Sequence, residues 1–119
     1  MEEIKVGEYI RTKSGNIGKV LDITNVTMQK RKKYLIKWNI SKAYYITAIR
    51  IIKHSKDIID LIEKNDYVNG CKVYEVRKDE IVVYLDRQPI NCYNYIMADE
   101  IKSIITKEQI KQIEYRIKE

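Results

Sequence analysis

The stretch Ile4-Lys5-Val6-Gly7-Glu8-Tyr9-Ile10 decides how this chain folds, because the chain carries a second version of it. That version is Ile62-Glu63-Lys64-Asn65-Asp66-Tyr67-Val68. Each leads through a glycine-containing segment into another β-rich run, residues 18–23 after the first and residues 71–76 after the second. Internal similarity of this kind is typical of a repeated structural unit. We therefore expect one small β unit that occurs twice. In it Tyr9 and Tyr67 should be largely buried, and Val20 and Val73 should face the core.

The similarity continues to the end of each copy. A tyrosine cluster follows the β-rich stretch in both, Tyr44-Tyr45-Ile46 in the first copy and Tyr93-Asn94-Tyr95-Ile96 in the second. Each copy then reaches a segment that opens with a helix-capping residue, Ser55 or Thr106. These landmarks place a first unit at residues 1–57 and a second at residues 58–119. Because two domains this small would be marginal alone, we predict that they share a core in one compact domain.

β-branched and aromatic residues between turn signals predict four strands in each copy. The ranges are 6–12, 17–23, 34–38 and 44–52 in the first copy, and 66–69, 72–77, 81–85 and 93–97 in the second. Residues 24–33 are predicted to form a long basic loop that the second copy lacks. The fold class that follows is mainly β, a tandem duplication of small Tudor-like or KOW-like β-barrel units that share a core. A short capped turn follows the first unit, and an α-helix ends the chain.

The C-terminal helix is predicted over residues 106–118. Thr106 and Gln109 have the spacing of a capping box, and Ile110, Ile113 and Ile117 fall on one helical face. Such an apolar stripe docks on a sheet, covers a barrel end or forms a dimer seam. A monomer and a homodimer through this helix both remain open.

Positive charge is concentrated in the first copy. Residues 1–57 hold 13 Lys or Arg against 5 Asp or Glu, a balance of +8, and residues 58–119 hold 10 against 12, a balance of −2. Nucleic-acid sites need cations for phosphates and aromatic faces for bases. The partner-binding or nucleic-acid-binding residues predicted on this basis are Lys30, Arg31, Lys32, Lys33, Lys37, Trp38, Tyr44 and Tyr45. A solvated basic loop that discourages edge pairing would give the same pattern.

Residues for catalysis, metal binding or membrane insertion are scarce. The single histidine, His54, follows a lysine and is expected to be a surface residue with no carboxylate placed to orient it. One histidine with Cys71 and Cys92 does not provide a zinc site, and we expect both cysteines to be free thiols. No apolar run approaches the roughly 20 residues that cross a bilayer, and no secretory signal follows Met1. We therefore expect a cytoplasmic protein that is not an enzyme and that uses no cofactor, no metal and no membrane.

Three stretches carry a resemblance to a known family. Residues 51–70, with Val6-Gly7-Glu8-Tyr9-Ile10-Arg11-Thr12 before them and Ile105-Thr106-Lys107-Glu108-Gln109 after them, resemble small proteins encoded by phages and prophages of low-GC Gram-positive bacteria. The resemblance implies an accessory phage protein, a class that includes anti-CRISPR inhibitors of an effector nuclease or its guide complex. It carries over no catalytic or binding residue.

The predicted function is therefore inhibition by binding. The leading hypothesis is a phage-encoded inhibitor that binds a host defence nucleoprotein, such as a CRISPR effector, in the bacterial cytoplasm through its basic first unit. The contacted component is protein, RNA or DNA. The alternatives are a nucleic-acid-binding accessory protein and a structural or adaptor phage protein, which would differ in the salt dependence of binding.

Overall fold

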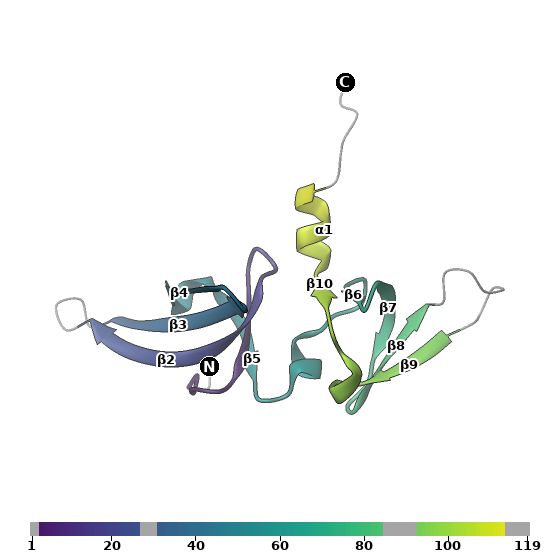
Figure 1. The fold of residues 1–119 in the computed structure, drawn as a ribbon, viewed down its shortest axis with the longest axis horizontal. Helices are drawn as coiled ribbons and strands as arrows, with labels where there is room; N and C mark the ends of the chain where they lie inside the picture. The colour runs from purple at the N-terminus through teal and green to yellow at the C-terminus, as the bar shows by residue number, and fades with distance from the viewer. Residues whose placement is uncertain (1–2, 27–30, 85–92, 114–119) are drawn as a thin grey trace, which may run out of the picture. The chain divides into compact units, whose positions relative to one another are not determined.

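The computed structural model describes residues 3–26, 31–84 and 93–113. The chain is mainly β and divides into two compact units, Met1–Leu61 and Ile62–Glu119, each with one five-stranded antiparallel sheet (Figure 1). The boundary falls after Leu61 rather than after Asp57, because the Arg11 Nη1 atom donates a 2.8 Å hydrogen bond to the Leu61 carbonyl and ties this segment to the first unit. A core shared by the two units stays a prediction.

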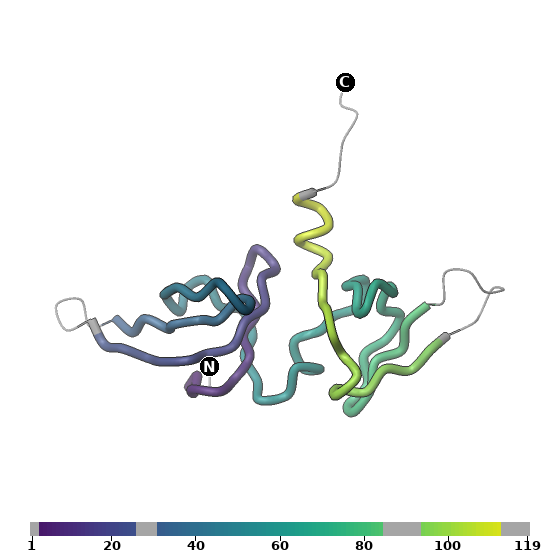
Figure 2. The backbone as a smooth tube through the Cα atoms, in the orientation of Figure 1, coloured from purple at the N-terminus to yellow at the C-terminus, as the bar shows by residue number. Residues whose placement is uncertain are grey.

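The first unit is one sheet in the order β4-β3-β2-β1-β5. Its elements are β1 (Tyr9–Thr12), β2 (Ile17–Val26), β3 (Arg31–Asn39), β4 (Lys42–Thr47), the 3-10 turn η1 (Ala48–Arg50), β5 (Ile51–Ser55) and the 3-10 turn η2 (Ile58–Leu61). The backbones of β2 and β3 run side by side along their length (Figure 2).

Three predictions for this unit were wrong in their boundaries. The strand predicted over residues 6–12 begins only at Tyr9, because Val6 and Gly7 form a turn in which Gly7 has a φ of 94°. Residues 24–26 and 31–33 of the loop predicted over residues 24–33 belong to strands instead, because Thr24 pairs with Lys33, Asn25 with Lys32 and Val26 with Arg31. Residues 27–30 lie outside the described residues. Arg31, Lys32 and Lys33 are all exposed, so this end of the β2–β3 pair buries no apolar side chains. The sequence there lacks the alternation of apolar and polar residues that would have predicted a strand. The strand predicted over residues 44–52 is interrupted by η1, which separates β4 from β5 and sends them to opposite edges of the sheet.

The core of the first unit gathers on one side of this sheet, which we call the inner face. It consists of Ile4, Ile10, Val20, Tyr34, Ile36, Ile46 and Ile51, with Ile23 and Trp38 packed against it. Gly18 on β2 makes room for this packing, because a Cβ atom there would lie 2.4 Å from Ile36 Cγ2 and 3.0 Å from Trp38 Cε3. The opposite side of the sheet is called the outer face.

The second unit has the strand order β10-β6-β7-β8-β9. Its elements are β6 (Tyr67–Val68), β7 (Cys71–Val76), β8 (Glu80–Tyr84), β9 (Tyr93–Met97), the 3-10 turn η3 (Ala98–Glu100), β10 (Ile104–Ile105) and α1 (Lys107–Ile113). Its buried apolar side chains are Ile62, Val68, Val73, Ile81, Val82, Val83 and Ile96.

The two sheets have the same strand order: β9-β8-β7-β6-β10 in the second unit corresponds strand by strand to β4-β3-β2-β1-β5 in the first. Both contain a register shift at the same point, between Val20 and Asp22 in one and between Val73 and Glu75 in the other. Val20 and Val73 were predicted to face the core, and both are buried.

The entry to the first strand is also alike in the two units. The Val20 amide donates to the Glu8 carbonyl at 2.8 Å, and the Val73 amide donates to the Asp66 carbonyl at the same distance. Positive φ angles occur just before each acid, at Gly7 (94°) and Asn65 (78°). Tyr9 and Tyr67, predicted to be largely buried, are only half-buried because both side chains lie on the outer sides of their sheets.

The capping box predicted for the C-terminal helix is confirmed. The Gln109 amide donates to Thr106 Oγ1 at 3.3 Å, and the Thr106 amide donates to Gln109 Oε1 at 3.0 Å. The described helix ends at Ile113, so residues 114–118 of the predicted helix lie outside the described residues. In the described part of the chain, no helix has the length and apolar character needed to cross a bilayer.

Candidate binding surfaces of the first unit

The structure divides the predicted binding residues between the two faces of the first sheet. Tyr34 and Ile36 of β3 are buried in the inner-face core, so the alternation of the strand puts Lys32 and Trp38 on that side. Among the predicted binding residues of β3, the alternation puts Arg31, Lys33 and Lys37 on the outer face. On β4, Tyr44 faces inward and Tyr45 outward, because Ile46 is buried. Lys30 lies outside the described residues.

Positive side chains form a cluster on the outer face. Lys37 pairs with Lys19 of β2, and Lys33 pairs with Thr24 of β2 and Thr47 of β4. Tyr45 pairs with Leu35 between them. We define the basic face as Lys19, Arg31, Lys33, Lys37 and Tyr45, all of which are exposed. Exposed Asp22 lies on the same face, where it pairs with Leu35, but within the described residues no carboxylate forms an ion pair with the four cations.

The corresponding face of the second unit has different chemistry. Matching the paired strands places Glu80 at the position of Lys33 and Tyr84 at that of Lys37. Its Arg77 is paired, with Nε 2.7 Å from Glu75 Oε2 and Nη1 3.5 Å from Glu80 Oε1. Lys72 keeps the cation at the position of Lys19, since Tyr9 pairs with Lys19 and Tyr67 with Lys72, whereas the cations at Lys33 and Lys37 are replaced. The positive charge that distinguishes the first unit therefore includes its outer face.

Lys32 differs from its neighbours in the basic run. Its Nζ atom donates a 3.1 Å hydrogen bond to Glu3 Oε1, and this bond raises the pKa of Lys32. The ion pair balances its charge, and the side chain belongs to the opposite face from Lys33. The run 30–33 is therefore not one continuous cationic surface.

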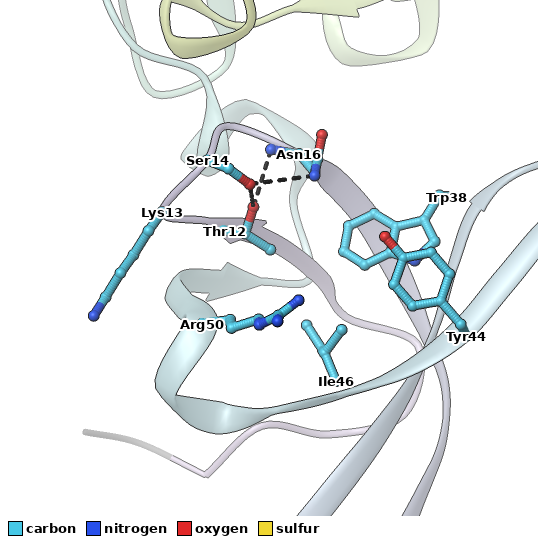
Figure 3. Close-up of a pocket in the computed structure, with 8 residues that line it drawn as sticks. All are labelled: Thr12, Lys13, Ser14, Asn16, Trp38, Tyr44, Ile46 and Arg50. Carbon is cyan, nitrogen blue, oxygen red and sulfur yellow. Dashed lines mark hydrogen bonds between the residues drawn. The ribbon is translucent and has the colours of Figure 1, made fainter. Parts of the chain in front are cut away.

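A pocket of about 320 Å³ opens on the inner face (Figure 3). The turn between β1 and β2, the inner side of β3 and β4, and η1 all contribute to its lining, which is formed by Thr12, Lys13, Ser14, Asn16, Trp38, Tyr44, Ile46 and Arg50. The only tryptophan of the chain is therefore a pocket residue. Trp38 and Tyr44, which were predicted as binding residues, meet here.

Two chemical features define this pocket. The Trp38 and Tyr44 rings pack with centroids 5.3 Å apart and a tilt of 36°, which forms an aromatic wall. Arg50 extends toward Trp38 and Ile46, whereas the Lys13 side chain points away from them (Figure 3). The turn is held by hydrogen bonds, since the Asn16 amide donates to Thr12 Oγ1 at 3.0 Å. The Lys13 backbone amide donates to the Arg50 carbonyl at 3.0 Å, which ties this turn to the end of η1. The pocket thus joins a stacking surface to the Arg50 guanidinium.

His54 is better organised than the sequence suggests, and the prediction of an unoriented surface histidine was wrong. Its Nδ1 atom lies 2.9 Å from Glu8 Oε1, and both side chains are largely buried. Burial raises the pKa of Glu8, but the amide of Lys5, the hydrogen bond with His54 and nearby positive charge outweigh it, so the Glu8 pKa is lowered. Pairing of β1 with β5 creates this contact, and no local sequence signal predicts it.

The remaining predictions concern metals and thiols. Among the described residues, no group of three or more His, Cys, Asp or Glu side chains is placed to hold a metal ion. Cys71 is a free thiol, and Cys92 lies outside the described residues. No protein-family model, curated protein or solved structure matches the chain, so these surfaces are interpreted from its own residues alone.

Proposed function

We propose that this chain is a non-enzymatic binding protein whose basic face contacts the phosphate backbone of a nucleic acid, free or within a nucleoprotein. The observation that carries the proposal is the set of four outer-face cations, Lys19, Arg31, Lys33 and Lys37, without ion-pair partners among the described residues. When cations of this kind neutralise phosphates, the counterions condensed on the nucleic acid are released, and this release gives affinity.

The arrangement of these residues suits an extended polyanion. Arg31, Lys33 and Lys37 follow one face of β3 over about 20 Å, at the usual rise of a strand. This length covers several phosphates of a nucleic-acid strand. Tyr45, about half exposed at 47%, offers an aromatic surface beside them on which a base can stack.

We also infer that the two units are copies of one Tudor-like or KOW-like β unit. The equal strand order, the register shift at the same place and the matching turn before the first strand support this inference. In such a pair the second unit keeps the fold while the first carries the basic face.

The proposed partner in the cell is a bacterial defence nucleoprotein, in the cytoplasm of a phage host. This part of the proposal is supported by the sequence resemblance of residues 51–70 and by the polyanion-binding chemistry of the first unit. A plain nucleic-acid-binding accessory protein would use the same face. The two differ in whether isolated nucleic acid is sufficient for binding.

A titration with labelled oligonucleotides tests the proposal. Anisotropy with single-stranded DNA, single-stranded RNA and duplex DNA at two salt concentrations should give binding that weakens as salt rises. Combined replacement of Lys19, Lys33 and Lys37 by Ser should weaken binding at least tenfold at low salt. It should reduce the salt slope by about two for the single strands and by nearly three for the duplex.

The matched control removes the same charge from the second unit, with Lys64, Lys102 and Lys111 replaced by Ser. Circular dichroism melts establish that both variants are folded. Equal affinity of the two triple variants would show that the basic face is not the site. Binding of no isolated nucleic acid by the wild type would contradict direct recognition and favour a protein surface as partner.

A further inference from the structure

The inner-face pocket of the first unit presents chemistry distinct from that of the basic face. Its aromatic wall is formed by Trp38 and Tyr44, and its cationic group is Arg50. Arg50 forms no ion pair within the described residues. A planar ring that stacks on the wall and an anion that pairs with the guanidinium would each find a partner.

The second unit provides an internal comparison for this pocket. The paired strands put Asn94 where the first unit has Tyr44, since Ile36 pairs with Tyr44 and Val83 with Asn94. The last residue of η3 is Glu100, where η1 ends in Arg50. The aromatic ring and the positive charge are thus both absent from the matching positions. These two substitutions remove the ligand chemistry and leave the strand order unchanged.

We propose that this pocket binds a nucleotide, with its base stacked on the Trp38–Tyr44 wall and its phosphate paired with Arg50. The guanidinium presents paired N–H donors that match phosphate oxygens. Ser14 and Asn16 add a hydroxyl and an amide to the lining, near which a sugar or base edge would lie, whereas the buried Thr12 Oγ1 is occupied by its bonds to Ser14 Oγ and the Asn16 backbone amide. The pocket would make the same contacts with a free mononucleotide and with one nucleotide of a single strand.

The size of the pocket limits the ligand. About 320 Å³ is at the lower end of the range for small-molecule sites, roughly 300–1,000 Å³. This volume suits one nucleotide rather than a dinucleotide or a duplex. The site also faces away from Lys33 and Lys37. It is therefore independent of the basic face, and either proposal can fail while the other holds.

Trp38 provides a direct readout, because it is the only tryptophan and lines the pocket. The experiment is a fluorescence titration, excited at 295 nm to avoid the nucleotide absorbance, with 5′-AMP, adenosine and inorganic phosphate on the wild-type chain. We expect saturable quenching by 5′-AMP, with adenosine and phosphate each weaker by about tenfold or more. Equal response to phosphate alone or to adenosine alone would overturn the two-part recognition.

Two variants copy the second unit, Tyr44→Asn and Arg50→Glu. Each should raise the Kd for 5′-AMP by about tenfold or more. The matched charge control is Lys56→Glu, an exposed residue outside the pocket, which should leave the Kd unchanged. Arg50 is exposed, so Arg50→Glu keeps the test valid if Tyr44→Asn unfolds. No quenching up to 10 mM 5′-AMP, or equal quenching in Arg50→Glu, would overturn the proposal.

An eight-nucleotide single strand separates the two sources of the ligand. Tighter quenching by the strand than by 5′-AMP, with competition between them, assigns the pocket to an unstacked base of a nucleic acid. Quenching by 5′-AMP alone assigns it to a free nucleotide. The triple variant of Lys19, Lys33 and Lys37 should bind 5′-AMP like the wild type. A loss there would contradict the separation of the two sites.

Discussion

His54 Nδ1 lies 2.9 Å from Glu8 Oε1 and joins β5 to the turn before β1. The same carboxylate oxygen accepts the Lys5 amide at 2.9 Å. A carboxylate can only accept, so the Nδ1 atom of His54 carries the proton in this bond. One oxygen of Glu8 therefore holds two segments of the first unit together.

This arrangement predicts an acid-sensitive contribution to stability. The pKa of Glu8 is lowered in the fold, because the hydrogen bonds and nearby positive charge outweigh the effect of burial, which raises it. Glu8 therefore binds a proton more readily in the unfolded chain than in the folded one. Its contribution to the free energy of unfolding is complete above the ordinary glutamate pKa and is lost as the pH falls through the lowered pKa of the fold. Glu8→Gln should be less stable than the wild type by about 1–3 kcal/mol at pH 7, and the difference should shrink below roughly pH 4.

Urea unfolding of both proteins between pH 7 and pH 3 measures this difference. Asp22→Asn is the control, because Asp22 is exposed on the outer face and loses the same charge. Its difference from the wild type should stay within about 0.5 kcal/mol. A Glu8→Gln difference that is constant over the whole pH range would contradict the assignment.

Asp66 is predicted to be the main polar anchor of the second unit. Its side chain is fully buried, with Oδ2 accepting the Glu63 amide at 2.7 Å and Oδ1 accepting the Lys107 amide at the start of α1 at 2.9 Å. Asp66→Ala would leave both amides without this acceptor and should cost about 2–4 kcal/mol. Asp66→Asn keeps one acceptor oxygen and should cost less.

Thermal unfolding and amide hydrogen exchange check this prediction. The Glu63 and Lys107 amides should lose protection in Asp66→Ala before the sheet does. The exposed Asp79→Ala variant is the control. Protection of both amides that survives in Asp66→Ala would show that the side chain does not anchor them.

Any side chain at Gly18 is predicted to destabilise the first unit for a steric reason. An added Cβ atom would lie 2.4 Å from Ile36 Cγ2 and 2.9 Å from the Lys37 carbonyl oxygen, so a backbone atom would have to move. Gly18→Ala should cost about 1–3 kcal/mol and change the fluorescence maximum of Trp38, whose Cε3 lies 3.0 Å from the place that the added atom would occupy.

Gly7→Ala provides the contrast for that measurement. Gly7 has a φ of 94° and no atom within 4 Å of an added Cβ, so the substitution strains the backbone but meets no neighbour. It should cost about 1 kcal/mol and leave the Trp38 emission unchanged. A shift of the emission maximum in Gly7→Ala but not in Gly18→Ala would reverse this explanation.

The sequence allowed prediction wherever the determining residues are close together. The turn before β1 recurs at residues 62–68, and Thr106 and Gln109 are three positions apart, so the buried valines and the capping box were both predicted. Strand faces were harder, because they depend on the register shift between Val20 and Asp22. Arg50 and His54 were missed as site residues, since only the pairing of distant strands and the position of η1 bring them to Tyr44 and to Glu8.

The last prediction separates two neighbours in the basic run. Lys33 lies on the outer face without an ion-pair partner among the described residues, whereas Lys32 lies on the other face and is paired with Glu3 at 3.1 Å. Lys33→Ser should therefore weaken oligonucleotide binding by about three- to tenfold at low salt, and Lys32→Ser should change it by less than about twofold. Anisotropy titrations at two salt concentrations compare the variants, which lose the same charge. Because both residues are exposed, neither change should shift stability by more than about 0.5 kcal/mol. A larger loss in Lys32→Ser than in Lys33→Ser would move the nucleic-acid contact to the inner face, where the pocket formed by Trp38, Tyr44 and Arg50 would become the favoured site.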